Sequence, residues 1–149
     1  MGIPIHPPRF DSDLLKPFYE GLAAGELRLT FNTRTGEPVW YPPEIVPGDP
    51  TAELEWQPVS PFGTVYSFTT ITRSLLPGDH KAEVPFTVVL FCSDDAPHAR
   101  VPGLFVGEGP AACGMRVRLS PVQAGDHVVA GFAPVEDRER TRLNSSHIT

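Results

Sequence analysis

The side chains best suited to acid–base or metal chemistry are five scattered histidines: His6, His80, His98, His127 and His147. No two of them lie at ligand spacing. Asp79–His80 and Asp126–His127 pair a carboxylate with an imidazole, the groups that proton transfer commonly uses. Both pairs fall in predicted loops, so we interpret them as surface polar residues. A Ser/His/Asp triad need not be local in sequence. However, the G-x-S-x-G, P-loop and G-x-G-x-x-G motifs are absent, and we predict no catalytic residue.

Aromatic and arginine side chains form the second candidate group. Tyr66 and Phe68 alternate along a predicted strand at 63–73, and such a pair could stack on a base or an adenine ring. Arg73 lies at the very end of that segment, and Arg116 and Arg118 share one face of a later strand. Guanidinium groups suit the phosphates of coenzyme A. The alternative is ordinary sheet packing for the aromatics and a solvated or partner-facing strand for the arginines.

Charge argues against nucleic acid as the main partner. The chain of 149 residues has a net charge of -6, with 12 Lys and Arg against 18 Asp and Glu. Nucleic-acid binding normally requires a basic surface that displaces counterions, and no basic run is present. A single-stranded nucleic-acid binder stays the alternative function.

Other sequence features indicate the cellular compartment in which we expect the protein. Cys92 and Cys113 lie outside any C-x-x-C pair, and we expect reduced thiols in the core rather than a disulfide. No stretch approaches the roughly 20 apolar residues that a membrane span needs. The N-terminus shows no signal-peptide pattern, so we expect a cytoplasmic protein that does not bind membranes.

The first 26 residues predict an arm with one helix. Asp11, Ser12 and Asp13 offer N-cap chemistry before a helix at about 14–25, with Gly25 as its C-cap. Pro17 either lies in the first turn or divides the helix. An apolar stripe at helical spacing covers the barrel or docks on a partner: Leu14, Phe18 and Leu22.

Strand patterns occupy most of the remaining chain. Alternating or β-branched segments predict strands at 25–32, 39–43, 54–60, 63–73, 85–93, 104–109, 115–122 and 127–134. We interpret 94–103 as a turn region. The last five of these strands, with no helix between them, predict a small closed or partly open barrel.

The order of these segments resembles the DUF35 family of zinc-ribbon and OB-fold proteins, which are encoded beside thiolases. Three segments carry the resemblance: FYEGLAAGELRL at 18–29, the W-x-P-V-S-x-x-G-T-V-Y-S-F pattern at 56–68, and GMRV at 114–117. The fold that this resemblance implies is mainly β, with degenerate rubredoxin-like zinc-ribbon hairpins before a five-stranded OB-fold barrel.

The resemblance also implies a function. Family members act as accessory subunits, so we expect a non-catalytic scaffold in a hetero-oligomer with a thiolase-like or lipid-transfer-protein-like enzyme. A coenzyme A thioester is then a candidate ligand, contacted by Tyr66, Phe68 and the three arginines. The apolar helix stripe, Trp40 and Tyr41 are the candidate partner contacts.

One departure from the family concerns the metal. Typical members carry two C-x-x-C pairs, which here fall on Asn32 and Thr35 and near 46–47 and 49–50, with no cysteine or histidine at any position. Structural zinc takes nitrogen and sulfur ligands in a tetrahedron. We therefore predict no zinc and no other cofactor, with Trp40, Tyr41 and Trp56 filling the hairpins.

Together these patterns divide the chain into four segments. They are an arm at 1–26, ribbon-like hairpins at 27–58, a barrel at 59–135, and a disordered or non-native tail at 136–149.

Overall fold

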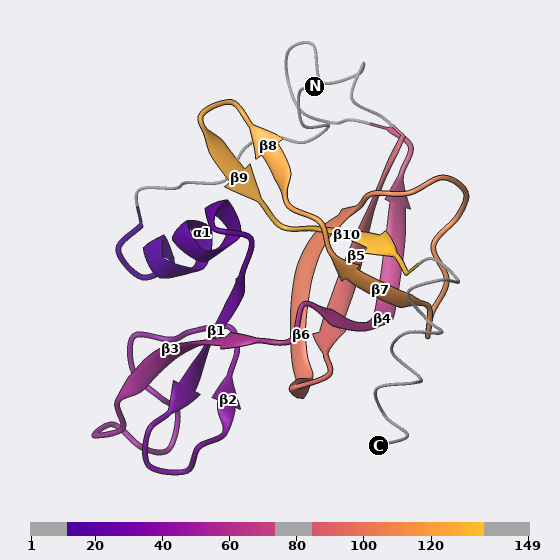
Figure 1. Cartoon of the computed structure of the whole chain (residues 1–149). Coiled ribbons are helices and arrows are strands. Elements are labelled where there is room, and N and C mark those ends of the chain that lie inside the picture. The colour runs from indigo at the N-terminus through magenta and orange to yellow at the C-terminus, as the bar shows by residue number, and fades with distance from the viewer. Residues whose placement is uncertain (1–11, 74–84, 136–149) are drawn as a thin grey trace, which may run out of the picture.

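The computed structural model describes residues 12–73 and 85–135. It comprises one helix, a three-stranded sheet, a closed barrel and a small hairpin (Figure 1). The predicted tail, Asp11 and the Asp79–His80 pair lie outside the described residues. Among the described residues, no helix is long and apolar enough to cross a membrane.

Helix α1 spans Lys16–Ala23, and its start differs from the prediction. Leu15 is the N-cap and makes no side-chain capping bond. Ser12 contributes its backbone oxygen, which accepts hydrogen bonds from the N–H groups of Leu15 (3.1 Å) and Lys16 (2.9 Å). Pro17 lies in the first turn, where its missing N–H costs no helical hydrogen bond.

Gly25 terminates the helix, as predicted, although it lies just after the C-cap residue Ala24 rather than at the C-cap itself. The N–H of Glu26 bonds to the carbonyl of Gly21 (2.8 Å), and the N–H of Gly25 to that of Leu22 (3.0 Å). This is the Schellman arrangement. It needs a left-handed residue after the helix, and Gly25 supplies φ of 80°.

The ribbon, defined here as residues 27–59, contains a sheet in the order β2-β1-β3. Its strands are β1 (Leu27–Asn32), β2 (Pro38–Val39) and β3 (Leu54–Val59). Leu27 and Leu29 are buried at 1% and 0% exposure against the rest of the chain. The Thr30 hydroxyl donates to the carbonyl of Val39, which fixes the short β2 against β1.

The barrel has the OB-fold topology, which confirms the predicted fold class. Its strands are β4 (Phe62–Ile71), β5 (Phe86–Ser93), β6 (Ala96–Phe105), β7 (Arg116–Leu119) and β10 (Gly131–Pro134). The order is β10-β6-β5-β4-β7, and a β10–β7 pairing completes the ring. Only β10 and β6 run parallel. A hairpin of β8 (Val122–Ala124) and β9 (His127–Val129) projects between the closing strands.

Several strand boundaries were predicted wrongly. The strand expected at 39–43 is only Pro38–Val39, and the one expected at 115–122 ends at Leu119. The segment read as a turn at 94–103 is most of β6, a strand of 10 residues. The single strand expected at 127–134 is divided into β9 and β10 at Ala130. Hairpin β8–β9 therefore leaves the barrel and packs beside α1.

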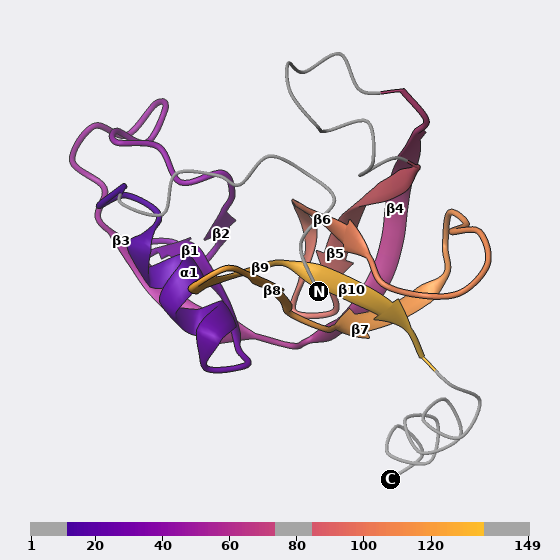
Figure 2. The ribbon, with the colours of Figure 1, turned by 90° about the horizontal axis from the view of Figure 1, so that it is seen from above.

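The core is continuous through the helix, the ribbon and the barrel. Inside the barrel, the rings of Phe91 and Phe132 stack at 4.2 Å, and both are 0% exposed. Gly103 has to lack a side chain, because a Cβ there would collide with the Phe132 ring. Helix α1 lies between the ribbon and the β8–β9 hairpin (Figure 2).

The cysteine prediction is half right. Both thiols are free, and Cys92 is buried as expected, but Cys113 is exposed. Cys113 lies in the connection between β6 and β7.

Candidate functional site

An apolar cavity among the described residues lies where the helix, the ribbon and the barrel meet. Its volume is about 240 Å³. Three groups of residues line it: Leu15, Phe18 and Tyr19 at the helix; Trp40 and Tyr41 after β2; and Val88, Pro102, Gly103, Leu104, Val129 and Ala130 from the barrel side. No charged side chain is among them, so the cavity suits an apolar group.

The floor of the cavity is the outer face of the barrel. Val88 pairs with Leu104 across β5 and β6, whereas the next residue along β5, Val89, is 0% exposed inside the barrel. Successive strand residues point to opposite faces, so Val88 and Leu104 point outward. Pro102, two residues before Leu104, lies on the same face.

The opposite wall is a cluster of aromatic rings. Trp40 lies 5.1 Å from Phe18, 5.6 Å from Tyr41 and 6.3 Å from Trp56 between ring centroids. The prediction that Trp40 and Trp56 fill the ribbon agrees with this packing, whereas Tyr41 is 59% exposed at the cavity rim. Burial, with a smaller contribution from Tyr41, raises the pKa of Tyr19, which keeps its hydroxyl neutral.

Arg100 and Tyr66 lie along the same outer face of the barrel. The Arg100 guanidinium is 4.0 Å from the centroid of the Tyr66 ring, a cation–π contact. Arg100 is two residues from Pro102, which places it about 7 Å along the strand from the cavity lining. Among the described residues, no carboxylate forms an ion pair with Arg100.

The structure separates Tyr66 from Phe68, which were predicted to share one face. The register between β4 and β5 shifts at Tyr66, a β-bulge. Beyond it, Phe68 pairs with buried Val89 and lies on the inner side of the sheet. Tyr66 contacts Arg100 on the outer side. The two rings therefore do not form one stacking surface for bases.

Arg116 and Arg118 share the outward face of β7, as predicted, because Val117 between them is 0% exposed. The guanidinium of Arg116 already binds a carboxylate of this chain. Its Nη1 and Nη2 donate to the two carboxylate oxygens of Asp94 at 2.7 and 2.8 Å. This hydrogen-bonded pairing raises the pKa of Arg116 further, so the guanidinium stays charged while its donors face Asp94 rather than a phosphate.

Arg73 is not near the other two predicted arginines. Thr64 of β4 pairs with Arg116. Ile71, where β4 ends before Arg73, is seven residues further, or about 23 Å along the strand. The three arginines do not form one anion site.

The helix stripe is divided between core and surface. Phe18 and Leu22 are 6% and 1% exposed, packed in the core of this chain, while Leu14 is half-buried. Phe18 and Leu22 are therefore unavailable to a partner while the fold is intact. The stripe also does not simply cover the barrel, because the helix packs mainly against β1 and β9.

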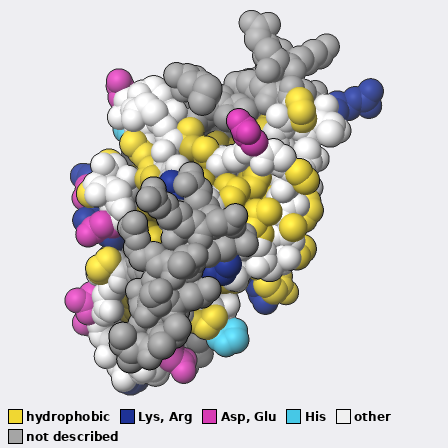
Figure 3. Space-filling model, turned by 45° about the vertical axis from the view of Figure 1, so that its right-hand side comes forward, with side chains coloured by type: hydrophobic (Ala, Val, Ile, Leu, Met, Phe, Trp, Pro, Cys, Tyr) yellow, Lys and Arg dark blue, Asp and Glu magenta, His cyan; other side chains and the backbone are white. Residues whose placement is uncertain are grey.

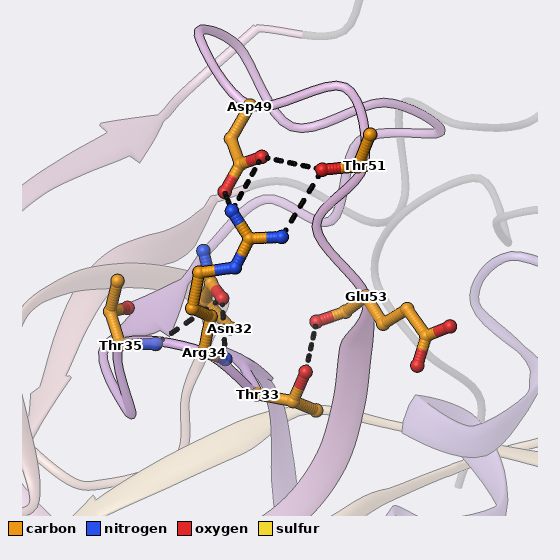
Figure 4. Close-up of polar contacts among 7 residues, drawn as sticks. All are labelled: Asn32, Thr33, Arg34, Thr35, Asp49, Thr51 and Glu53. Atoms are coloured by element: carbon orange, nitrogen blue, oxygen red, sulfur yellow. Dashed lines mark hydrogen bonds and ion pairs between the residues drawn. The ribbon is translucent and has the colours of Figure 1, made fainter.

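The ribbon tip does not fit zinc (Figure 4). The side-chain oxygen of Asn32 accepts hydrogen bonds from the backbone N–H groups of Arg34 (2.9 Å) and Thr35 (3.4 Å). Arg34 reaches the second loop, where it pairs with Asp49 (3.3 Å) and donates to the Thr51 hydroxyl (3.2 Å). No group of three metal-ligating side chains occurs in the described parts of the chain. A metal cation beside Asp49 would be repelled by the positively charged guanidinium of Arg34, which already pairs with that carboxylate.

This arrangement, which we call the tip clip (Asn32, Arg34, Asp49 and Thr51), was missed in the sequence. Arg34 and Asp49 are 15 residues apart, so no local spacing links them. The remaining acid–base candidate, Asp126–His127, lies at the turn of the exposed β8–β9 hairpin.

Comparison with known proteins shows which domain family the barrel is similar to. Residues 56–121 match the family model for the C-terminal OB-fold domain of ChsH2. Over its OB-fold barrel the chain therefore matches the DUF35 family, in agreement with the resemblance seen in the sequence. A solved chain described as "Ltp2-ChsH2(DUF35) aldolase" superposes with a TM-score of 0.72 at 18% identity, over 85% of this chain and 98% of that one. A search of curated proteins finds no match.

Proposed function

We propose that this protein is a non-catalytic accessory subunit of a hetero-oligomer with a thiolase-like or lipid-transfer-protein-like enzyme that acts on acyl-CoA. The observation that carries the proposal is the shared architecture. The helix, ribbon and barrel together superpose on 98% of a chain whose description names an Ltp2-ChsH2(DUF35) aldolase. The identity of 18% makes that a likeness of fold, and the partner is our inference from it.

The ribbon loop after β2 is the surface that we assign to the partner. Ile45 and Tyr41 are the most exposed of the large hydrophobic side chains in the described residues, at 66% and 59%. Exposed apolar residues that cluster on one loop commonly mark a protein interface. A second group, which includes Tyr66 and Val106, lies on the barrel, where hydrophobic side chains gather in the space-filling view (Figure 3).

The test is co-expression with a candidate thiolase-like or lipid-transfer-protein-like enzyme, followed by gel filtration. We expect a single complex, and Ile45→Glu should disrupt it because a carboxylate would be buried unpaired. Glu55→Gln is the matched control on the exposed side of β3. Two separate peaks for the unmodified pair would refute the accessory function.

The isolated chain should not turn over acyl thioesters. Hydrolysis or condensation of an acyl-CoA by the purified chain, lost on substitution of His127, would contradict the non-catalytic assignment.

A further inference from the structure

We propose that the cavity between helix, ribbon and barrel is a binding site for an amphipathic ligand, whose apolar body fills the cavity and whose negatively charged group lies at Arg100. This rests on the proposed function only for the source of the ligand, and it deepens that function by placing a ligand away from the arginines of β7.

The size and lining of the cavity define the apolar body. The cavity is open to solvent on one side, and its volume of about 240 Å³ leaves room for an apolar group larger than benzene, which fits a cavity of roughly 150 Å³. The walls are the rings of Phe18 and Trp40 on one side and the aliphatic side chains of Val88 and Leu104 on the other. These surfaces favour a branched, cyclic or medium-length hydrocarbon group.

The walls of the cavity offer water few hydrogen-bond partners. A buried water needs two to four polar partners, and the polar side-chain groups among the lining residues are those of Tyr19, Trp40 and Tyr41. The raised pKa of Tyr19 agrees with a poorly hydrated wall.

Arg100 is the cation best placed for the charged group. It is on the same barrel face as Pro102, and its guanidinium lies 4.0 Å from the centroid of the Tyr66 ring. A guanidinium that stacks on a ring through its face can still donate hydrogen bonds from its edge. Stacking on Tyr66 holds the guanidinium in place, which reduces the entropy lost when an anion binds.

The other hollow beside the cavity is less suited to an anion. It lies across Tyr19 and contains Lys16, but Glu20 and Asp126 line it as well. Two carboxylates against one ammonium group repel a second anion. The charged group should therefore leave the cavity toward Arg100.

The ligand can be a free carboxylic acid or a thioester of a phosphate-bearing carrier, since both join an apolar body to an anion. Titration of the full chain with octanoate, octanoyl-CoA, free CoA and octanol distinguishes these sources. Fluorescence of Trp40, in the cavity wall, reports occupancy. We expect octanoyl-CoA or octanoate to bind at least tenfold more tightly than either CoA or octanol alone.

Variants separate the two halves of the site. Val88→Phe should fill the cavity and weaken the octanoyl ligand at least tenfold, whereas Thr69→Phe, the exposed strand neighbour paired with Val88, should not. Arg100→Gln should weaken the anionic ligand about tenfold and leave octanol unchanged. Arg73→Gln is its control.

Three results would overturn the proposal. They are equal binding of octanoyl-CoA and free CoA, no binding of any probe by the chain or by its complex with the enzyme, and an effect of Val88→Phe on enzyme binding alone. The last would make the cavity a socket for a partner segment. In each case co-elution with the enzyme still tests the accessory function separately.

Discussion

The tip clip offers the sharpest test of how the ribbon is held. We expect Asp49→Ala to destabilise the chain, because it removes the acceptors used by both Arg34 and Thr51. The Arg34 side chain is 62% exposed and that of Asp49 26%. An ion pair this open to solvent contributes about 0.2–1 kcal/mol. With the lost hydrogen bond, the total is about 1 kcal/mol, or a fall in Tm of about 2–4 °C for a chain of this size.

A ribbon held by zinc would lose far more stability when the metal is removed than this ribbon loses when the tip clip is broken. Structural zinc contributes on the order of 10 kcal/mol of binding free energy in small domains, so chelation would unfold the ribbon. The tip clip predicts no change of Tm in EDTA and a weakening in high salt, because salt screens exposed pairs.

The assay is a double-mutant cycle by thermal unfolding, with metal analysis of the same samples. Arg34→Ala, Asp49→Ala and the double variant should give a coupling of about 0.2–1 kcal/mol. Glu53→Gln is the control, since its carboxylate points away from the clip (Figure 4). Zero coupling, stoichiometric zinc, or a large loss of stability in EDTA would each refute this account.

Three further predictions follow from burial and close contacts. Gly103→Ala should cost about 1–3 kcal/mol in urea unfolding, because the new methyl group overlaps the Phe132 ring; unchanged stability would contradict the barrel packing. Cys113 should react at once with Ellman's reagent and Cys92 only after unfolding, since burial raises the Cys92 pKa and shields its thiol; two fast thiols would show that the barrel opens. Burial raises the pKa of Tyr19 above 10.0, so the stability that its neutral form contributes is present below that pH and is lost as the pH rises through the folded-state pKa. Tyr19→Phe should flatten this alkaline decline, and an unaltered pH profile would refute the assignment.

Local patterns were sufficient for much of the fold. Alternation at Leu27 and Leu29 predicted β1, and the β-branched segment at 63–73 predicted β4, because each strand buries one face along most of its length. Gly25 predicted the helix end, since the Schellman turn needs a left-handed residue.

Strand β6 was missed because its proline and polar residues resemble a loop. Pro102 pairs with Leu90 on one side, while β10 meets β6 only at Leu104 and Phe105. The missing N–H of Pro102 therefore interrupts no ladder on its other side, and such edge positions are where strands accept proline. That edge becomes visible only when the whole barrel is assembled.

The candidate site was less predictable because it depends on long-range geometry. A one-residue bulge at Tyr66 reverses the facing of every later residue in β4. Tyr66 and Phe68 therefore point to opposite faces of the sheet. The cavity brings together the helix, the ribbon and two barrel strands from separate parts of the chain. Its apolar residues each look like ordinary core residues in the sequence.

The late position of β10 in the barrel has a consequence for biosynthesis. Gly131–Pro134 pairs with both β6 and β7, so the ring cannot close until this segment has left the ribosome. Until then β6 and β7 expose unpaired edges, which are templates for aggregation. The helix and ribbon, made of near neighbours in sequence, can form first. Truncated chains that end before Gly131 should therefore accumulate as insoluble protein rather than as shortened subunits.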